Sequence, residues 1–118
     1  IGKDATATFG DGYVSPNTSF EIMHGLDVGD DCVIAWNCHF LDEDFHRISY
    51  DGQTAKDPKI RIGSHVWIGC NVTILKGVVI PNGCVVAAGS VVTGKFYEKN
   101  ALIAGNPATV IRRNIKWR

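Results

Sequence analysis

An aliphatic residue returns at every sixth position over much of this chain, a period that belongs to neither a helix nor an ordinary strand. From Ile62 the sequence divides into IGSHVW, IGCNVT, ILKGVV, IPNGCV and VAAGSV, which begin with Ile, Ile, Ile, Ile and Val. Their fifth positions hold Val, Val, Val, Cys and Ser. The same division fits upstream as VGDDCV, IAWNCH and FLDEDF, and more loosely from IGKDAT at the start. A short internal repeat of this kind is typical of a solenoid.

Each six is expected to form a short strand followed by a tight bend, so that three sixes close a triangular coil. The first-position aliphatic points to the axis of the coil, and the fifth-position residue fills a corner. Coils then stack at about one strand spacing, ~4.8 Å. Burying each aliphatic side chain contributes ~1.5–3 kcal/mol. An ordinary sandwich with accidental spacing is disfavoured, because five consecutive sixes keep the period.

Length and charge limit the alternatives. A chain of 118 residues is expected to form a single β-helix domain over 1–118. It begins inside the sixfold pattern and without Met, which is compatible with a trimmed form that lacks an N-terminal segment. The 12 Lys and Arg balance 12 Asp and Glu, so no basic field favours nucleic acid. No apolar run approaches the ~20 residues of a membrane span. A soluble, cytoplasmic protein is the default expectation.

The four cysteines, Cys32, Cys38, Cys70 and Cys84, form no CxxC pair. Three of them stand where the repeat needs a small apolar side chain. We therefore expect reduced packing residues rather than a metal site or disulfides.

The stretch WIGCNVTILKGVVIPNGCVVAAGSVVT, followed by IAGNPATVIRR, resembles the hexapeptide-repeat acyltransferases. It is similar to the maltose and galactoside O-acetyltransferases and to the polysaccharide O-acetyltransferases, and the similarity covers residues 28–113. The resemblance implies an all-β, left-handed parallel β-helix. The handedness comes from the resemblance alone, since crossovers between parallel strands are normally right-handed. The resemblance also implies acetyl-CoA as co-substrate, no metal, and a homotrimer whose active sites are shared between neighbouring copies.

The repeat breaks between Phe40 and Ile62, and the excess residues predict an external loop at about 46–59. His46 begins this loop and ends the phrase DEDFH. An imidazole can remove a proton from a sugar hydroxyl near neutral pH, and a histidine where the loop departs is the base in the resembling family. Asp42, Asp44 and His46 match the D-x-D-x-H phrase of the polysaccharide branch. Asp44 is either the acceptor that orients the imidazole or a turn-capping carboxylate.

The resemblance places six further residues near acetyl-CoA. Cys70 and Ala88 stand one coil apart and are expected to stack along one edge, where small side chains admit the pantetheine arm. Trp67 matches a tryptophan beside the active site, or is an apolar prop for a neighbouring subunit. Thr93 matches a threonine near the cofactor, and Lys95 stands one position later than the family's lysine. Arg112 matches a phosphate-side arginine.

The segment from Asn106 predicts a short C-terminal helix, with Asn106 as N-cap and Pro107 at the first helical position. Its cations would suit either the phosphates of CoA or the C-terminal end of the helix.

The sequence thus predicts an acetyl-CoA-dependent O-acetyltransferase acting on a sugar or polysaccharide precursor by direct attack. One alternative is a non-catalytic β-helix assembly module. Another is a zinc carbonic anhydrase on the same fold, suggested by His24-Gly25, which requires three histidine ligands. The matching repeats IAWNCH and IGSHVW lack the paired histidines of that branch. The acceptor is not identified; its specificity is expected to reside in residues 13–24 and 46–59.

Overall fold

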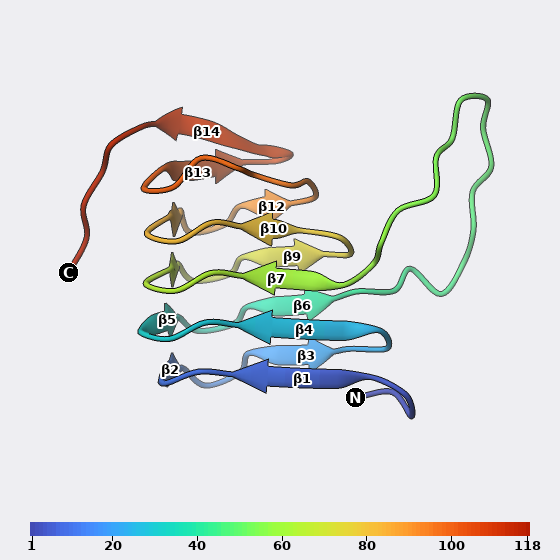
Figure 1. Ribbon diagram of the computed structural model, residues 1–118, viewed down its shortest axis with the longest axis horizontal. Helices are drawn as coiled ribbons and strands as arrows, with labels where there is room; N and C mark the ends of the chain where they lie inside the picture. Colours follow the sequence, from blue (N-terminus) through green and yellow to red (C-terminus); the bar gives the residue numbers. More distant parts are fainter.

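Three sheets, each receiving one strand per turn of the chain, form a triangular prism in the computed structural model, which describes residues 1–118 (Figure 1). The first sheet contains β1 (Thr6–Phe9), β4 (Gly25–Val28), β7 (Ile60–Ile62) and β10 (Val79–Ile80). The second contains β2 (Gly12–Val14), β5 (Cys32–Ile34), β8 (Trp67–Ile68), β11 (Val85–Val86), β13 (Leu102–Gly105) and β14 (Ala108–Arg112). The third contains β3 (Ser19–Glu21), β6 (His39–Leu41), β9 (Thr73–Leu75) and β12 (Val91–Val92). The predicted all-β solenoid is confirmed.

The prism winds in the left-handed sense. In Figure 1 the near strands of the first sheet run to the left, and the chain then passes behind and returns to the right through the third sheet while it climbs. Successive coils pair through parallel ladders in all three sheets. The left-handed parallel β-helix implied by the resemblance is therefore confirmed.

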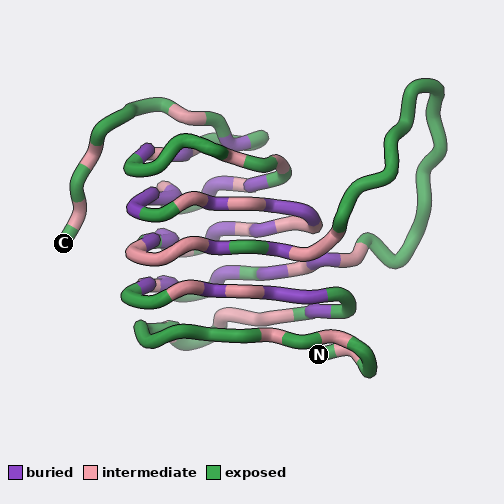
Figure 2. The backbone as a smooth tube through the Cα atoms, in the orientation of Figure 1, coloured by how far each residue is buried: buried purple, intermediate pink, exposed green.

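First-position side chains fill the interior of the prism. Figure 2 shows that buried positions recur along the stacked coils above the first. Ile62, Ile68, Ile74 and Ile80 are each no more than 3% exposed. Ile62 pairs with Ile80, and Ile68 pairs with Val86 one coil later. Each buried side chain contributes ~1.5–3 kcal/mol to stability, so this stacked ladder is the main apolar contribution to the fold.

Fifth-position side chains are buried as well. Val66, Val72, Val78 and Cys84 are fully buried, and Ser90 is 2% exposed. All four cysteines are free, and burial raises the pKa of the Cys32, Cys38 and Cys84 thiols. The three therefore act as small, protonated packing groups, as the sequence predicted.

Left-handed backbone conformations recur at the corners of the prism. At the corner between the second and third sheets, Asn17, Asn37, Asn71 and Gly89 have φ values of 62°, 59°, 57° and 77°. They stack along one edge, where the Asn71 amide donates to the Trp36 carbonyl. Asparagine and glycine adopt this region most readily, so the polar, turn-forming residues of the repeat are those that let the chain bend.

The external loop runs from Asp42 to Lys59, between β6 and β7, and stands away from the prism (Figure 1). The partners Leu26 and Ile60, on either side of the loop, are 34 residues apart in sequence. Ile62 and Ile80 in the next coil are 18 apart. The chain leaves the prism after Leu41, four residues earlier than the predicted 46–59. The ladder resumes in register after the loop, so the loop adds to the edge without disturbing the core.

The predicted C-terminal helix is wrong. Residues from Ala108 to Arg112 form β14, which pairs antiparallel with β13, and Asn106 and Pro107 make the turn between them. Ala108 and Val110 contact the end of the core. Pairing with the open edge of β13 satisfies the backbone and covers that edge. This tertiary contact outweighs the local capping signal of Asn106-Pro107.

Candidate active site

His46, the predicted base, lies on the loop 42–59 at the edge where the third sheet passes to the first. It lines a cavity of about 530 Å³ together with Asp44, Arg47, Lys56 and Lys76. The loop limbs and the turn at Lys76 supply these side chains, so the exposed imidazole lies between one loop and one edge of the prism.

The root of the loop is anchored by Asp42, which is fully buried. Its carboxylate accepts hydrogen bonds from the backbone N–H groups of Met23, His24 and Gly25, at 2.7, 2.8 and 2.8 Å. Charge-assisted bonds to backbone donors are among the stronger hydrogen bonds. Asp42 therefore joins the start of the loop to the bend of the preceding coil.

Two further contacts attach the loop to the prism. The Asp44 carboxylate pairs with the Lys76 ammonium at 2.6 Å. The Lys56 ammonium donates to the Thr93 carbonyl at 2.9 Å. The structure thus places Asp44 against Lys76, whereas the sequence offered it as an acceptor for the imidazole. Thr93 and Lys95, predicted near the cofactor, lie on this loop side.

A second cavity, of about 650 Å³, lies over the second sheet and is termed here the apolar groove. Its lining includes Trp36, Trp67, Cys70, Val85, Ala88 and Leu102. Cys70 and Ala88 stack as predicted, since the Gly89 amide donates to the Cys70 carbonyl at 2.9 Å. The Trp36 and Trp67 rings are 53% and 42% exposed. A wall of small side chains flanked by two indoles can accept a slender, partly apolar ligand.

The two cavities share no residue. His46 lies at the edge between the third and first sheets, whereas the apolar groove covers the second sheet. Arg112, at the end of β14, is exposed and makes no ion pair. Within one chain the structure therefore brings Trp67, Cys70 and Ala88 together, and separately gathers His46, Asp44 and Thr93.

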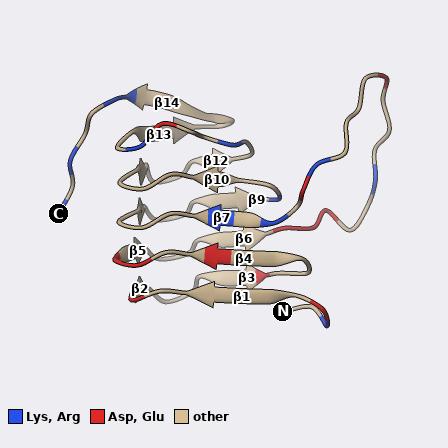
Figure 3. Cartoon of the chain, in the orientation of Figure 1, with Lys and Arg blue, Asp and Glu red and all other residues tan.

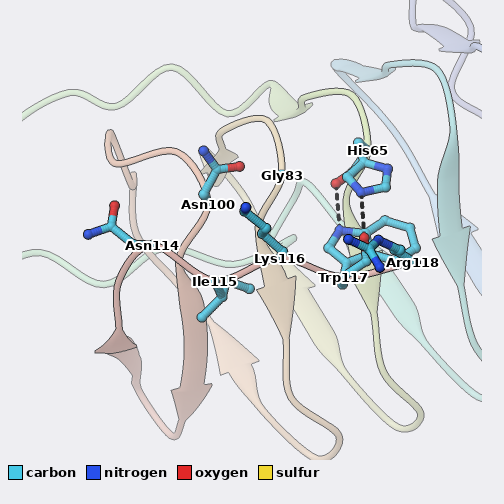
Figure 4. A pocket seen from close by; sticks show the side chains of 8 residues that line it. All are labelled: His65, Gly83, Asn100, Asn114, Ile115, Lys116, Trp117 and Arg118. Atoms are coloured by element: carbon cyan, nitrogen blue, oxygen red, sulfur yellow. Dashed lines mark hydrogen bonds between the residues drawn. The ribbon is translucent and has the colours of Figure 1, made fainter.

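His65 holds the C-terminal residues against a corner of the prism (Figure 4). Its ring stacks on Trp117, with centroids 3.9 Å apart and planes 7° apart. The Trp117 indole donates to the His65 carbonyl at 2.8 Å, and the His65 Nε2 lies 3.0 Å from the Trp117 carbonyl oxygen. Asp31 lies 2.6 Å from the His65 Nδ1. These contacts form a tail clamp made of His65, Asp31 and Trp117.

We expect the tail clamp to release as pH rises. The hydrogen bond with Asp31, followed by that with the Trp117 carbonyl, raises the pKa of His65 above its ordinary value. A raised folded-state pKa means that the stabilising contribution is complete below the unfolded pKa of about 6.5 and is lost as pH climbs through the raised value. The Trp117 emission is therefore expected to shift to longer wavelength through that window.

The matched variants are His65→Gln, which should remove the pH dependence, and Asp31→Asn, which should move its midpoint to lower pH. His39→Gln is the control, because the His39 ring bonds the Ser19 hydroxyl, at 2.7 Å, on another face. An unchanged midpoint in Asp31→Asn would contradict this account of the clamp.

Sequence reasoning missed several of these contacts. Lys56 and Thr93 are 37 residues apart, and His65 and Trp117 are 52 apart. No local pattern joins such pairs. The His65 side chain is 42% exposed. The three backbone N–H groups that donate to Asp42 had one signal in the sequence, the placement of an acidic residue directly after a strand.

No three His, Cys, Asp or Glu side chains of the chain gather so as to ligate a metal ion. None of its segments is a helix long and apolar enough to cross a membrane.

Comparison with known proteins finds one family model and several similar proteins. The family model "Bacterial transferase hexapeptide (six repeats)" matches residues 59–94. The chain is 48% identical over 117 residues to an "Uncharacterized 24.8 kDa protein in cps region" of Klebsiella pneumoniae, covering 99% of this chain and 53% of that protein. It is 39% identical over 116 residues to the polysialic acid O-acetyltransferase of Neisseria meningitidis, covering 96% of this chain and 52% of that protein. The chain spans about half the length of these two relatives.

Solved structures of acetyltransferases are also similar to this chain. The polySia-specific acetyltransferase NeuO superposes with a TM-score of 0.86 at 32% identity, covering 98% of this chain and 56% of that one. A hexapeptide-repeat acetyltransferase of Vibrio cholerae O1 biovar eltor, solved in complex with acetyl coenzyme A, has a TM-score of 0.62 at 25% identity, covering 96% of this chain and 69% of that one.

Proposed function

Because the chain belongs to the hexapeptide-repeat acyltransferase family, we propose that it forms the β-helical part of an acetyl-CoA-dependent O-acetyltransferase. The acceptor is a hydroxyl of a sugar or polysaccharide. Similarity to a polysialic acid O-acetyltransferase and to NeuO supports a glycan acceptor. The observation that carries the proposal is the presence, in one chain of this fold, of an imidazole on a projecting loop and a groove of small side chains on another face.

The apolar groove fits the arm of acetyl-CoA, which supplies an activated acetyl thioester. Cys70 and Ala88 leave room for an extended chain beside the backbone, and the Trp67 ring gives it an apolar wall. Close stacking limits the depth of the groove, since a Cβ added at Gly69 would lie 2.8 Å from the Ala88 nitrogen. We assign Arg112 to the phosphates, and Thr93 and Lys95 to the loop-side part of the same ligand.

His46 acts as general base. It takes the proton of the acceptor hydroxyl as that oxygen attacks the thioester carbonyl carbon. The C–S bond breaks, an O-acetyl ester forms, and the imidazolium returns its proton to the CoA sulfur that leaves. Proton transfer of this kind contributes typically ~10²–10⁴-fold to the rate. Asp44, held by Lys76, positions the loop segment that carries His46.

The separation of the two cavities supports a homotrimer with shared sites. His46 and the apolar groove lie on different sides of one prism. A neighbouring copy that sets its groove against this loop would complete one site. The exposed Trp36 and Trp67 rings offer apolar area for such a contact.

Mixing two inactive variants tests both the reaction and the shared site. His46→Ala lacks the base, and Ala88→Trp fills the groove at an exposed position. Each alone is expected to lack acetyl transfer from acetyl-CoA to oligosialic acid, whereas trimers reassembled from both should regain part of it, because some interfaces pair an intact loop with an intact groove. Thr109→Trp on the outer strand β14 is the control for bulk. No recovery, or a monomer by light scattering, would contradict the shared site.

A further inference from the structure

Charges around the His46 cavity are unevenly compensated. The cavity is lined by the two acids Glu43 and Asp44 and by the three cations Arg47, Lys56 and Lys76. Both acids already have partners: Glu43 lies 3.0 Å from the His24 ring, and Asp44 lies 2.6 Å from the Lys76 ammonium. The hydrogen bond with His24 lowers the pKa of Glu43, so this carboxylate stays ionised and bonded to His24.

Arg47 and Lys56 are therefore left without a carboxylate, and they are termed here the cationic pair. Neither takes part in an ion pair. Figure 3 shows basic residues on both limbs of the loop. Arg47 precedes the tip and Lys56 follows it. Between them, the Gln53 backbone N–H donates to the Tyr50 carbonyl at 3.3 Å and closes the tip.

Lys56 is the more constrained of the two. One of its protons goes to the Thr93 carbonyl, which leaves two for a ligand. Burial, and then the charges of Lys76 and Lys95, lower its pKa. A bound anion would oppose both effects, because a nearby negative charge favours the protonated ammonium.

We propose that the cationic pair binds the carboxylate of an acidic glycan and so holds the acceptor hydroxyl at His46. Arg47 can meet a carboxylate with two parallel N–H bonds, and Lys56 adds a point charge from the opposite limb. The inference rests on the proposed function and specifies its acceptor as a carboxylate-bearing sugar. The phosphates of CoA have similar chemistry, so the experiment must separate the two sources.

The test compares oligosialic acid with its carboxyl methyl ester as acceptors for the double variant Arg47→Gln/Lys56→Gln. The KM for oligosialic acid is expected to rise about tenfold or more, as for loss of a charge-assisted hydrogen bond. The KM for the ester, which starts high, should not change, and neither should the KM for acetyl-CoA. Lys99→Gln/Arg118→Gln, which removes the same charge at exposed sites away from the loop, is the matched control.

Three outcomes would overturn the proposal. A rise in the KM for acetyl-CoA would assign the cationic pair to the CoA phosphates. An equal rise in the KM for the acid and for the ester, or a parent protein that uses both acceptors equally well, would show that the carboxylate is not recognised. Should the parent transfer no acetyl group, the proposed function fails instead. Calorimetric titration of the parent with oligosialic acid and with the ester then decides the anion site separately, since preferential binding of the acid supports it and equal binding excludes it.

Discussion

Replacing His46 with alanine is expected to lower the rate of acetyl transfer by about 10²–10⁴-fold, the usual contribution of a general base. His46 is the imidazole that the loop 42–59 contributes to the cavity at its edge of the prism. Binding of acetyl-CoA should survive, because the apolar groove contains no part of the loop. The measurement is initial rate by CoA release, alongside acetyl-CoA affinity by calorimetry.

His39→Ala provides the matched control. His39 lies on β6, is exposed, and contacts Ser19 rather than the loop. Its loss should leave both the rate and the affinity near those of the parent. A His46→Ala protein that keeps more than about a tenth of the parental rate would exclude His46 as the base, because a rate loss below about tenfold is smaller than the usual contribution of a general base.

Asp42→Ala is expected to lower the free energy of unfolding by about 2 kcal/mol or more. The change leaves the N–H groups of Met23, His24 and Gly25 without their acceptor; the bond from Gly25 is buried and the other two are part-buried. An unsatisfied buried donor costs about 1–3 kcal/mol, and the two part-buried donors add less. The site is fully buried, so water does not easily replace the carboxylate. The check is the denaturant midpoint at constant slope, measured by circular dichroism.

Asp42→Asn keeps one acceptor oxygen and should give an intermediate loss. Asp51→Ala, at the exposed tip of the same loop, should change stability by less than about 0.5 kcal/mol. Equal stability of Asp42→Ala and Asp51→Ala would show that the loop root does not depend on this carboxylate.

The interior of the fold could be predicted because it repeats. Each aliphatic at a first position faces the same environment as its partner one coil away, so periodicity alone identified Ile62, Ile68, Ile74 and Ile80 as core. The handedness could not come from spacing, because a period of six fits a coil of either sense. The left-handed sense was predicted from the resemblance to the hexapeptide-repeat acyltransferases, and the structure confirms it.

Predictions from local signals were wrong or incomplete where a pairing with another element decides the structure. Asn106 and Pro107 form a good local helix start, but β13 offered an unpaired edge and the chain formed a hairpin. The ion pair of Asp44 with Lys76 likewise depends on the turn after β9, which no pattern near Asp44 could indicate. The candidate residues were named from sequence, and their division between two cavities became visible only in three dimensions.

The loop 42–59 enters and leaves the prism at one edge, and the ladder continues in register on both sides of it. Lengthening this loop destabilises the fold only slightly, because each doubling of loop length adds only about 0.6 kcal/mol to the entropic cost of closing it. We expect acceptor preference to reside in the segment between Asp42 and β7, so replacing this segment should change the acceptor while the isoleucine ladder keeps its packing. A chimera that carries a relative's loop in this place is therefore expected to acquire that relative's acceptor preference at a nearly unaltered melting temperature.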